Sequence, residues 1–105
     1  MKNKIVAPSV SFYDAMLEDL RDNPQLIEEF LRVALAESGE GDGDYLLQKT
    51  LKLVAQARGM SKVAKSAGLT RESLSRALSV RGNPTLSTLN AVTGALGLRL
   101  TIAPM

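Results

Sequence analysis

The sequence predicts a mainly α fold, a five- to six-helix domain that contains a helix-turn-helix and ends in a short C-terminal β-strand. Apolar residues recur every three to four positions along most of the chain, which is helical periodicity. The run MSKVAKSAGLTRESLSRALS, residues 60–79, holds two short helical patterns separated by Gly68, and glycine readily adopts the positive φ at which a helix ends. The run LRLTI, residues 98–102, alternates apolar and polar residues as a strand does.

Two helices are predicted in the N-terminal part of the chain. In the first, residues 11–20, large apolar side chains recur at a spacing of four, which places them on one helical face. The second, residues 24–38, has a broad apolar face and starts at Asn23 and Pro24, because asparagine favours the cap and proline suits the first turn. The run SGEGDG that follows, residues 38–43, is the clearest linker in the chain.

The linker divides the chain into an N-terminal acidic helical segment, residues 1–43, and a helix-turn-helix domain with the C-terminal strand, residues 44–105. A support helix, residues 44–58, is expected ahead of the helix pair. Thr70 offers a side-chain oxygen that caps the second helix of the pair. Thr85 does the same for a final helix that ends before a glycine. The apolar positions predicted to form the core are Leu47, Leu51, Val63, Leu74, Leu89 and Val92.

Composition excludes most enzyme classes. The chain has no cysteine and no histidine, so disulfides, the usual zinc sites and His-dependent nucleophile systems are ruled out. A Gly-rich phosphate loop of the GxxxxGK[ST] type is also missing. We therefore expect no enzyme activity, no catalytic residue, no metal and no cofactor. No apolar run approaches the roughly 20 residues that span a bilayer, and a cytoplasmic location is expected.

Acidic and basic residues separate into two halves. Residues 1–44 contain four basic and ten acidic side chains, a net charge of −6, whereas residues 45–105 contain nine basic side chains and one acidic one, a net charge of +8. A basic half that carries a helix-turn-helix suits double-stranded DNA, because each neutralised phosphate releases counterions. An acidic half is expected to face a basic protein instead. The alternative is that these charges only solvate helix surfaces.

In a helix-turn-helix the second helix enters the major groove of DNA. The candidate DNA-reading residues on it are Thr70, Arg71, Glu72, Ser75 and Arg76. An arginine can donate two hydrogen bonds to guanine, and Glu72 can accept one from cytosine. A first-turn carboxylate also interacts favourably with the helix dipole, so a purely capping role for Glu72 stays open. The residues expected to hold phosphates, which give affinity without sequence information, are Ser61, Lys62, Lys65 and Arg81.

The predicted strand needs a partner, because its backbone donors and acceptors are otherwise unpaired. Its apolar positions are Leu98, Leu100 and Ile102. One hypothesis pairs it with the same strand of a second subunit, which would make a homodimer, and another pairs it with the sheet edge of a different protein. Pairing with residues 4–7, or a simple extended tail, are the alternatives.

The chain also resembles a known group of proteins. The run GMSKVAKSAGLTRESLSRALSVRGNPTLSTLNAVTGALGLRL is similar to the C-terminal half of the HigA-like antidote (antitoxin) proteins of addiction modules, which carry a phage-repressor-like, or XRE-like, helix-turn-helix. The run DNPQLIEEFLRVALAESGEGD resembles the N-terminal segment of the same group. One departure is Met60, which stands where many repressors of the wider class have glutamine, so a glutamine contact to phosphate does not carry over.

The resemblance implies two partners and no membrane. Antidotes of this kind neutralise a RelE/ParE-like toxin by direct binding, and as dimers they repress their own operon at a palindromic operator. Because such a toxin grips RNA it is basic, and Glu28, Glu29 and Glu37 are the candidate toxin-binding residues. Two alternatives are a stand-alone prophage-type transcriptional regulator and a protein-interaction module without DNA binding.

Overall fold

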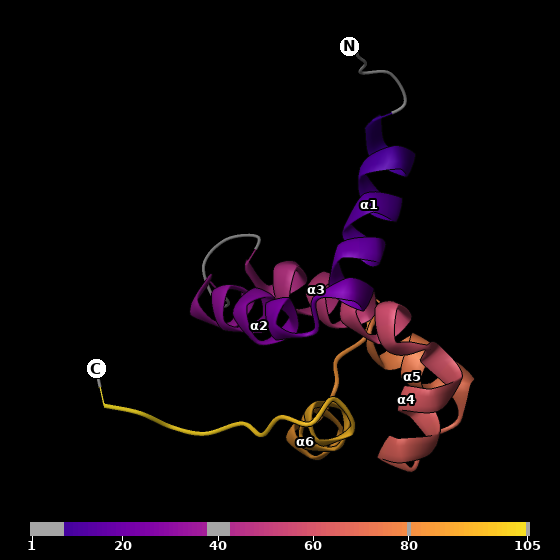
Figure 1. Cartoon of the computed structure of the whole chain (residues 1–105). Helices are drawn as coiled ribbons and strands as arrows, with labels where there is room; N and C mark the ends of the chain where they lie inside the picture. Colours follow the sequence, from indigo (N-terminus) through magenta and orange to yellow (C-terminus); the bar gives the residue numbers. More distant parts are fainter. Residues whose placement is uncertain (1–7, 38–42, 80, 105) are drawn as a thin grey trace.

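The structure is a computed structural model that describes residues 8–37, 43–79 and 81–104. Within these residues the chain forms α1 (Pro8–Asp22), α2 (Gln25–Glu37), α3 (Gly43–Arg58), α4 (Met60–Ala67), α5 (Arg71–Ala77) and α6 (Leu86–Ala95), shown in Figure 1. The mainly α class is therefore confirmed. The predicted helix ends differ from these by at most three residues. Among the described residues, no helix is both long and apolar enough to cross a membrane.

The long helix α3 lies at the centre and packs against α1 and α2 on one side and α4 on the other, and α6 packs against α4. Figure 1 shows the N-terminal end of α1 standing away from the other helices. The largest fully buried side chains come from helices along the whole chain and belong to one continuous core; they are Leu20, Leu51, Leu74, Leu78, Val54 and Val92. Both parts of the chain contribute to that core, and the division at residue 43 into two units stays a prediction.

The predicted core positions lie where the periodicity placed them. Leu51, Val63, Leu74 and Val92 are buried. Leu47 and Leu89 are half-buried and pack against the same core. The spacing of apolar residues therefore predicted correctly which face of each of these helices is buried.

The turn between α4 and α5 follows the predicted capping. Gly68 has φ 75° and ψ 28°, and the Leu69 amide donates to the carbonyl oxygen of Ala64 at 2.8 Å, which closes the end of α4. The Thr70 hydroxyl oxygen accepts from the Ser73 amide at 3.0 Å and caps α5. The cap of α6 by Thr85 is formed in the same way. These caps fix where the two short helices start and stop.

One predicted cap is wrong. The side-chain amide of Asn23 donates to the carbonyl oxygen of Asp19 at 3.3 Å, at the end of α1, and does not cap α2. The first turn of α2 is instead held by backbone bonds, in which the Leu26 and Ile27 amides donate to the carbonyls of Asn23 and Pro24. The asparagine therefore closes the first helix.

The predicted C-terminal β-strand is wrong for this chain. Residues 98–104 have an extended backbone without strand pairing, and the segment leads away from α6 in Figure 1. The Leu98 amide donates to the Thr93 carbonyl at 2.9 Å, as part of the end of α6. Leu98 and Leu100 are half-buried, whereas Ile102 is 97% exposed. Alternating residues make a strand only beside another strand, and no described segment pairs with this one as a strand; residues 4–7 fall outside the described residues.

Candidate functional site

The outward face of α5 carries the predicted DNA-reading residues. Arg71, Glu72 and Arg76 are exposed and Ser75 is half-buried. Leu74 faces the opposite way, because it is fully buried in the core. Helical spacing places Glu72 and Arg76 on the side turned away from Leu74 and Ser75 at the edge of that side, whereas Arg71, three residues before Leu74, is exposed in the first turn of the helix.

Thr70 occupies the N-terminal end of that face and has a structural task. Its hydroxyl oxygen caps α5, and its hydroxyl group also contacts the Ser73 hydroxyl at 2.9 Å. Glu72 lies in the first turn of α5, where a carboxylate is favoured by the helix dipole. The two positions therefore stabilise the start of the helix on which the arginines sit.

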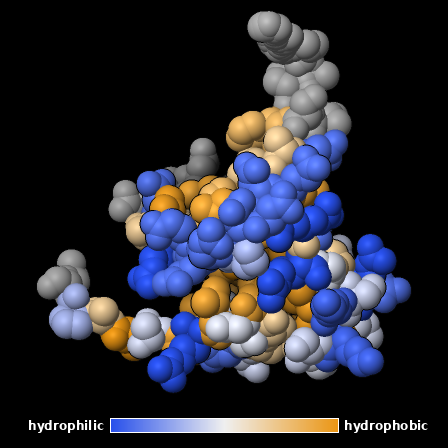
Figure 2. All heavy atoms as spheres, in the orientation of Figure 1, coloured by the Kyte–Doolittle hydropathy of each residue, from blue (hydrophilic) through white to orange (hydrophobic). Residues whose placement is uncertain are grey.

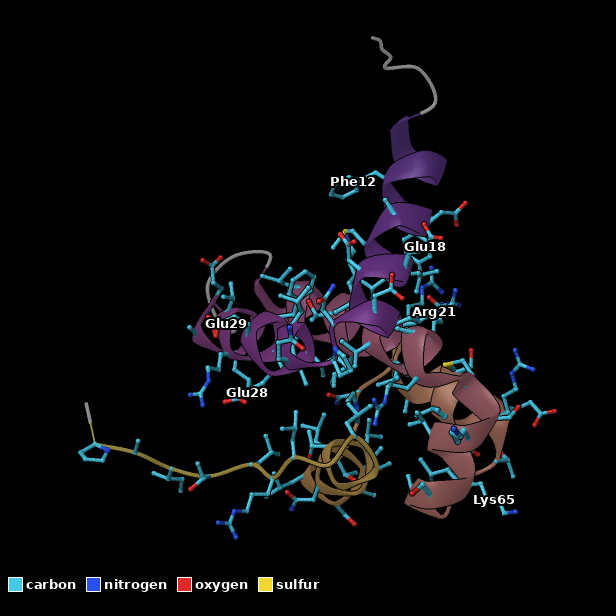
Figure 3. The ribbon with its side chains drawn as sticks, viewed as in Figure 1. Phe12, Glu18, Arg21, Glu28, Glu29 and Lys65 are labelled. Carbon is cyan, nitrogen blue, oxygen red and sulfur yellow. The ribbon has the colours of Figure 1, made fainter. Side chains whose placement is uncertain are left out.

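The residues predicted to hold phosphates are exposed on two other elements. Ser61, Lys62 and Lys65 are exposed on α4, and Arg81 is exposed on the loop after α5. Figure 3 shows Lys65 near the end of α4 farthest from α1. Within the part of the chain that the structure describes, none of these cations forms an ion pair. Their positive charge is therefore available to a negatively charged partner.

Arg76 and Arg81 lie together at a surface hollow of about 380 Å³ between α5, the loop and the start of α6. The loop is held tightly there. The Gly82 amide donates to the Ser79 carbonyl at 2.9 Å, and the buried side chain of Gln48 on α3 donates to the Gly82 carbonyl. An added Cβ at Gly82 would lie 2.5 Å from the Ala77 carbonyl oxygen. Only glycine fits this contact, which fixes Arg81 beside Arg76.

A second hollow, of about 380 Å³ and mostly polar, brings together three cations from different helices. Its walls include Arg21 of α1, Arg58 of α3 and Lys62 of α4, with Ser66 beside them. Sequence reasoning missed Arg21 and Arg58, because the first belongs to an otherwise acidic helix and the second to a helix treated as a support. The position of Arg58, two residues before α4, was a usable signal; the sequence contained none for Arg21.

The predicted toxin-binding glutamates do not form one group. Glu28 is paired with Arg32 one turn later along α2, and this contact raises the pKa of the Arg32 guanidinium. Glu29 lines a wide apolar groove between α1, α2 and α3. Glu37 is exposed at the C-terminal end of α2. Glu29 and Glu37 therefore form no ion pair among the described residues.

Comparisons with known proteins identify the family. A family model described as "Probable addiction module antidote protein" matches residues 10–104. An uncharacterized protein of Haemophilus influenzae is 40% identical over 75 residues, which cover 71% of this chain and 77% of that protein. No solved structure shows significant similarity to the chain. The chain therefore belongs to the family of probable addiction module antidote proteins.

Proposed function

We propose that the chain is the antitoxin of a type II toxin–antitoxin module, which binds and neutralises a RelE/ParE-like toxin and represses its own operon. The family membership supports the antitoxin role. The repression would take place in the bacterial cytoplasm, on a palindromic operator that is bound by a dimer. A palindrome presents the same half-site twice, so two copies of α5 would read it.

The observation that carries the DNA-binding part is the unpaired basic surface of α4, α5 and the loop after α5. Arg71 and Arg76 are the side chains that would read bases, because they project from the exposed face of a capped helix. An arginine to guanine contact is the commonest specific one in the major groove. Lys62, Lys65 and Arg81 would hold phosphates, which gives affinity for any sequence.

Arg21 and Arg58 extend this proposed surface toward α1. They line one hollow with Lys62, and a concave group of cations suits a phosphate of the DNA backbone. In this arrangement the acidic α1 contributes a single cation at the edge of the DNA surface.

The test of DNA binding is a fluorescence anisotropy titration with the DNA upstream of the operon, repeated over a range of salt concentrations. Each phosphate neutralised contributes about 0.9 to the slope of log affinity against log salt on B-DNA. We expect a steep slope and a preference for one palindrome over scrambled DNA. A protein-interaction module without DNA binding would show neither.

The test of toxin binding is co-purification with the product of the adjacent reading frame, followed by growth rescue. We expect a stable complex and restored growth when both proteins are produced. If the chain binds its operator but fails to capture or neutralise that product, the stand-alone regulator is the better description.

A further inference from the structure

An apolar groove of about 710 Å³ lies between α1, α2 and α3. Its apolar walls are formed by Phe12, Tyr13 and Met16 of α1, Phe30, Val33 and Ala34 of α2, and Leu46 and Leu53 of α3. Phe12 is 65% exposed and Val33 is 54% exposed. Figure 3 shows Phe12 projecting from α1 toward the side on which α2 lies, whereas Glu18 projects from the other side of α1.

The groove is open to solvent on one side, where the N-terminal end of α1 extends beyond α2 and α3 (Figure 1). Figure 2 shows hydrophobic surface on the upper part of α1 and again over the α2 side of the molecule. A contiguous apolar surface of this kind in a small chain marks a place where another molecule binds. The groove lies apart from the cation-lined hollows, since its walls share no residue with theirs.

The charges at the groove define the chemistry of its occupant. Glu29 lines it from α2, and Glu37 lies on the same helical face, four residues after Val33. Lys49 and Lys52 line it from α3. A matching segment has an apolar stripe with basic residues along the side that meets α2 and acidic or polar residues along the side that meets α3.

We propose that this groove is the toxin-binding site, and that it takes an amphipathic segment of the toxin with that pattern of charge. The inference rests on the proposed function as an antitoxin. Residues 8–37 contain seven acidic side chains and two basic ones, and Arg32 is already paired with Glu28. The α1–α2 part of the chain is therefore complementary to a basic protein.

A second copy of the chain fits the groove less well. The helix most available for such pairing is α1, which carries Asp14, Glu18, Asp19 and Asp22 and a single cation, Arg21. Arg21 does not line the groove, because it lies in the hollow that also holds Arg58 and Lys62. A second α1 could set its carboxylates against Lys49 and Lys52 on the α3 side, but it has no free cation for Glu29 and Glu37 on the α2 side.

The experiment measures toxin affinity by titration calorimetry for the full-length chain and two matched variants. Val33→Asp places a carboxylate in the groove at a position already open to solvent, so the core is not disturbed. Leu86→Asp makes the same change at an exposed leucine on α6, away from the groove. We expect Val33→Asp to weaken toxin binding at least tenfold and to abolish growth rescue, while Leu86→Asp binds the toxin as the parent chain does.

A charge-reversal pair tests the acidic edge. Glu29→Lys is expected to weaken toxin binding severalfold, whereas Glu18→Lys, on the side of α1 away from the groove, leaves it unchanged. Operator affinity and the melting temperature should stay at the parent values in both groove variants, which shows that the fold and the DNA surface are intact.

Three results would overturn the proposal. Parent-like toxin affinity in Val33→Asp removes the groove from the toxin interface while leaving the antitoxin function in place. If sedimentation without toxin shows that the parent chain is a dimer and Val33→Asp is a monomer, the groove binds a second copy of the chain. No toxin binding by the parent chain refutes the antitoxin function itself, and this inference with it.

Discussion

The α1–α2 region and the α4–α5 region pack on the same core but present opposite surfaces. The first is acidic and has a wide groove with apolar walls. The second is basic and borders two smaller hollows, one with Arg21, Arg58 and Lys62 in its walls and the other with Arg76 and Arg81. An apolar groove gains free energy when protein side chains cover it, since apolar area leaves water. Exposed cations without partners gain most from a polyanion.

Under the proposed function, the two surfaces would let one small chain bind two partners that do not compete for the same residues. The acidic helices would repel DNA, so under the proposed function DNA would bind on the α4–α5 side. The same charge would attract a basic protein to the α1–α2 side.

The largest effect is expected at the centre of the basic surface. Arg76→Ala should weaken operator binding by about 1–3 kcal/mol, the value of one good bidentate base contact. The melting temperature should not change, because Arg76 is exposed and lacks an ion-pair partner among the described residues. Fluorescence anisotropy measures the affinity, and toxin binding by the same variant is the control. Unchanged operator affinity would remove Arg76 from the reading residues.

A comparable effect, on stability, is expected at the loop beside Arg76. Gly82→Ala should destabilise the fold by about 1–3 kcal/mol, because the new methyl group meets the last carbonyls of α5. Gly94→Ala is the matched control in α6, where an added Cβ meets nothing within 4 Å. That change should stabilise the protein by roughly 0.5–1 kcal/mol, since alanine is the better helix residue.

Urea unfolding followed by circular dichroism measures both glycine variants. If Gly82→Ala were as stable as the parent chain, the loop would not be packed against α5 as described. The operator affinity of Gly82→Ala reports on the position of Arg81, which belongs to this loop. If the substitution displaces the loop, the affinity for DNA of any sequence should also fall.

A smaller effect is expected at Arg21, which crosses the division between the two regions. Arg21→Ala should lower the salt slope of DNA binding by about 0.9, which is the loss of one phosphate contact. Sequence preference should not change, because a phosphate contact carries no base information. Arg32→Ala is the control, since Arg32 is occupied by Glu28. An unaltered slope in Arg21→Ala would confine the DNA surface to α3, α4, α5 and the following loop.

The local features of the fold were predictable from sequence. Gly68 and Thr70 produced the expected turn because their signals depend on a few neighbouring residues: one tolerates positive φ and the other supplies a capping oxygen. The buried faces of the helices followed from spacing alone, as at Leu51 and Leu74. Such features need no knowledge of the tertiary arrangement.

The features that depend on distant parts of the chain were not predictable. The C-terminal strand failed because a strand is completed by another segment, and the alternation at Leu98 and Leu100 does not say whether one is present. Phe12 and Leu53 line the same groove, and only the packing of α1 on α3 brings the two residues to one surface. The hollow at Arg21 has the same origin.

The smallest expected effect is on the titration of Tyr13, whose pKa depends on how far the groove wall is exposed to solvent. Burial raises the pKa of the Tyr13 phenol above its usual 10.0, and the hydroxyl donates to the side-chain oxygen of Gln56 on α3. Because the pKa of Tyr13 is higher in the folded than in the unfolded chain, the neutral phenol contributes to the stability of the folded chain below pH 10.0. This contribution is lost as the pH rises through the pKa of Tyr13 in the folded chain. The chain has two tyrosines, so Tyr45→Phe leaves Tyr13 as the reporter. Phenolate absorbance should rise at a higher pH in the native protein than in urea, and at a still higher pH when toxin covers the groove. Coincident titration curves of the native and the urea-unfolded protein would mean that the groove wall at Tyr13 is fully exposed to solvent.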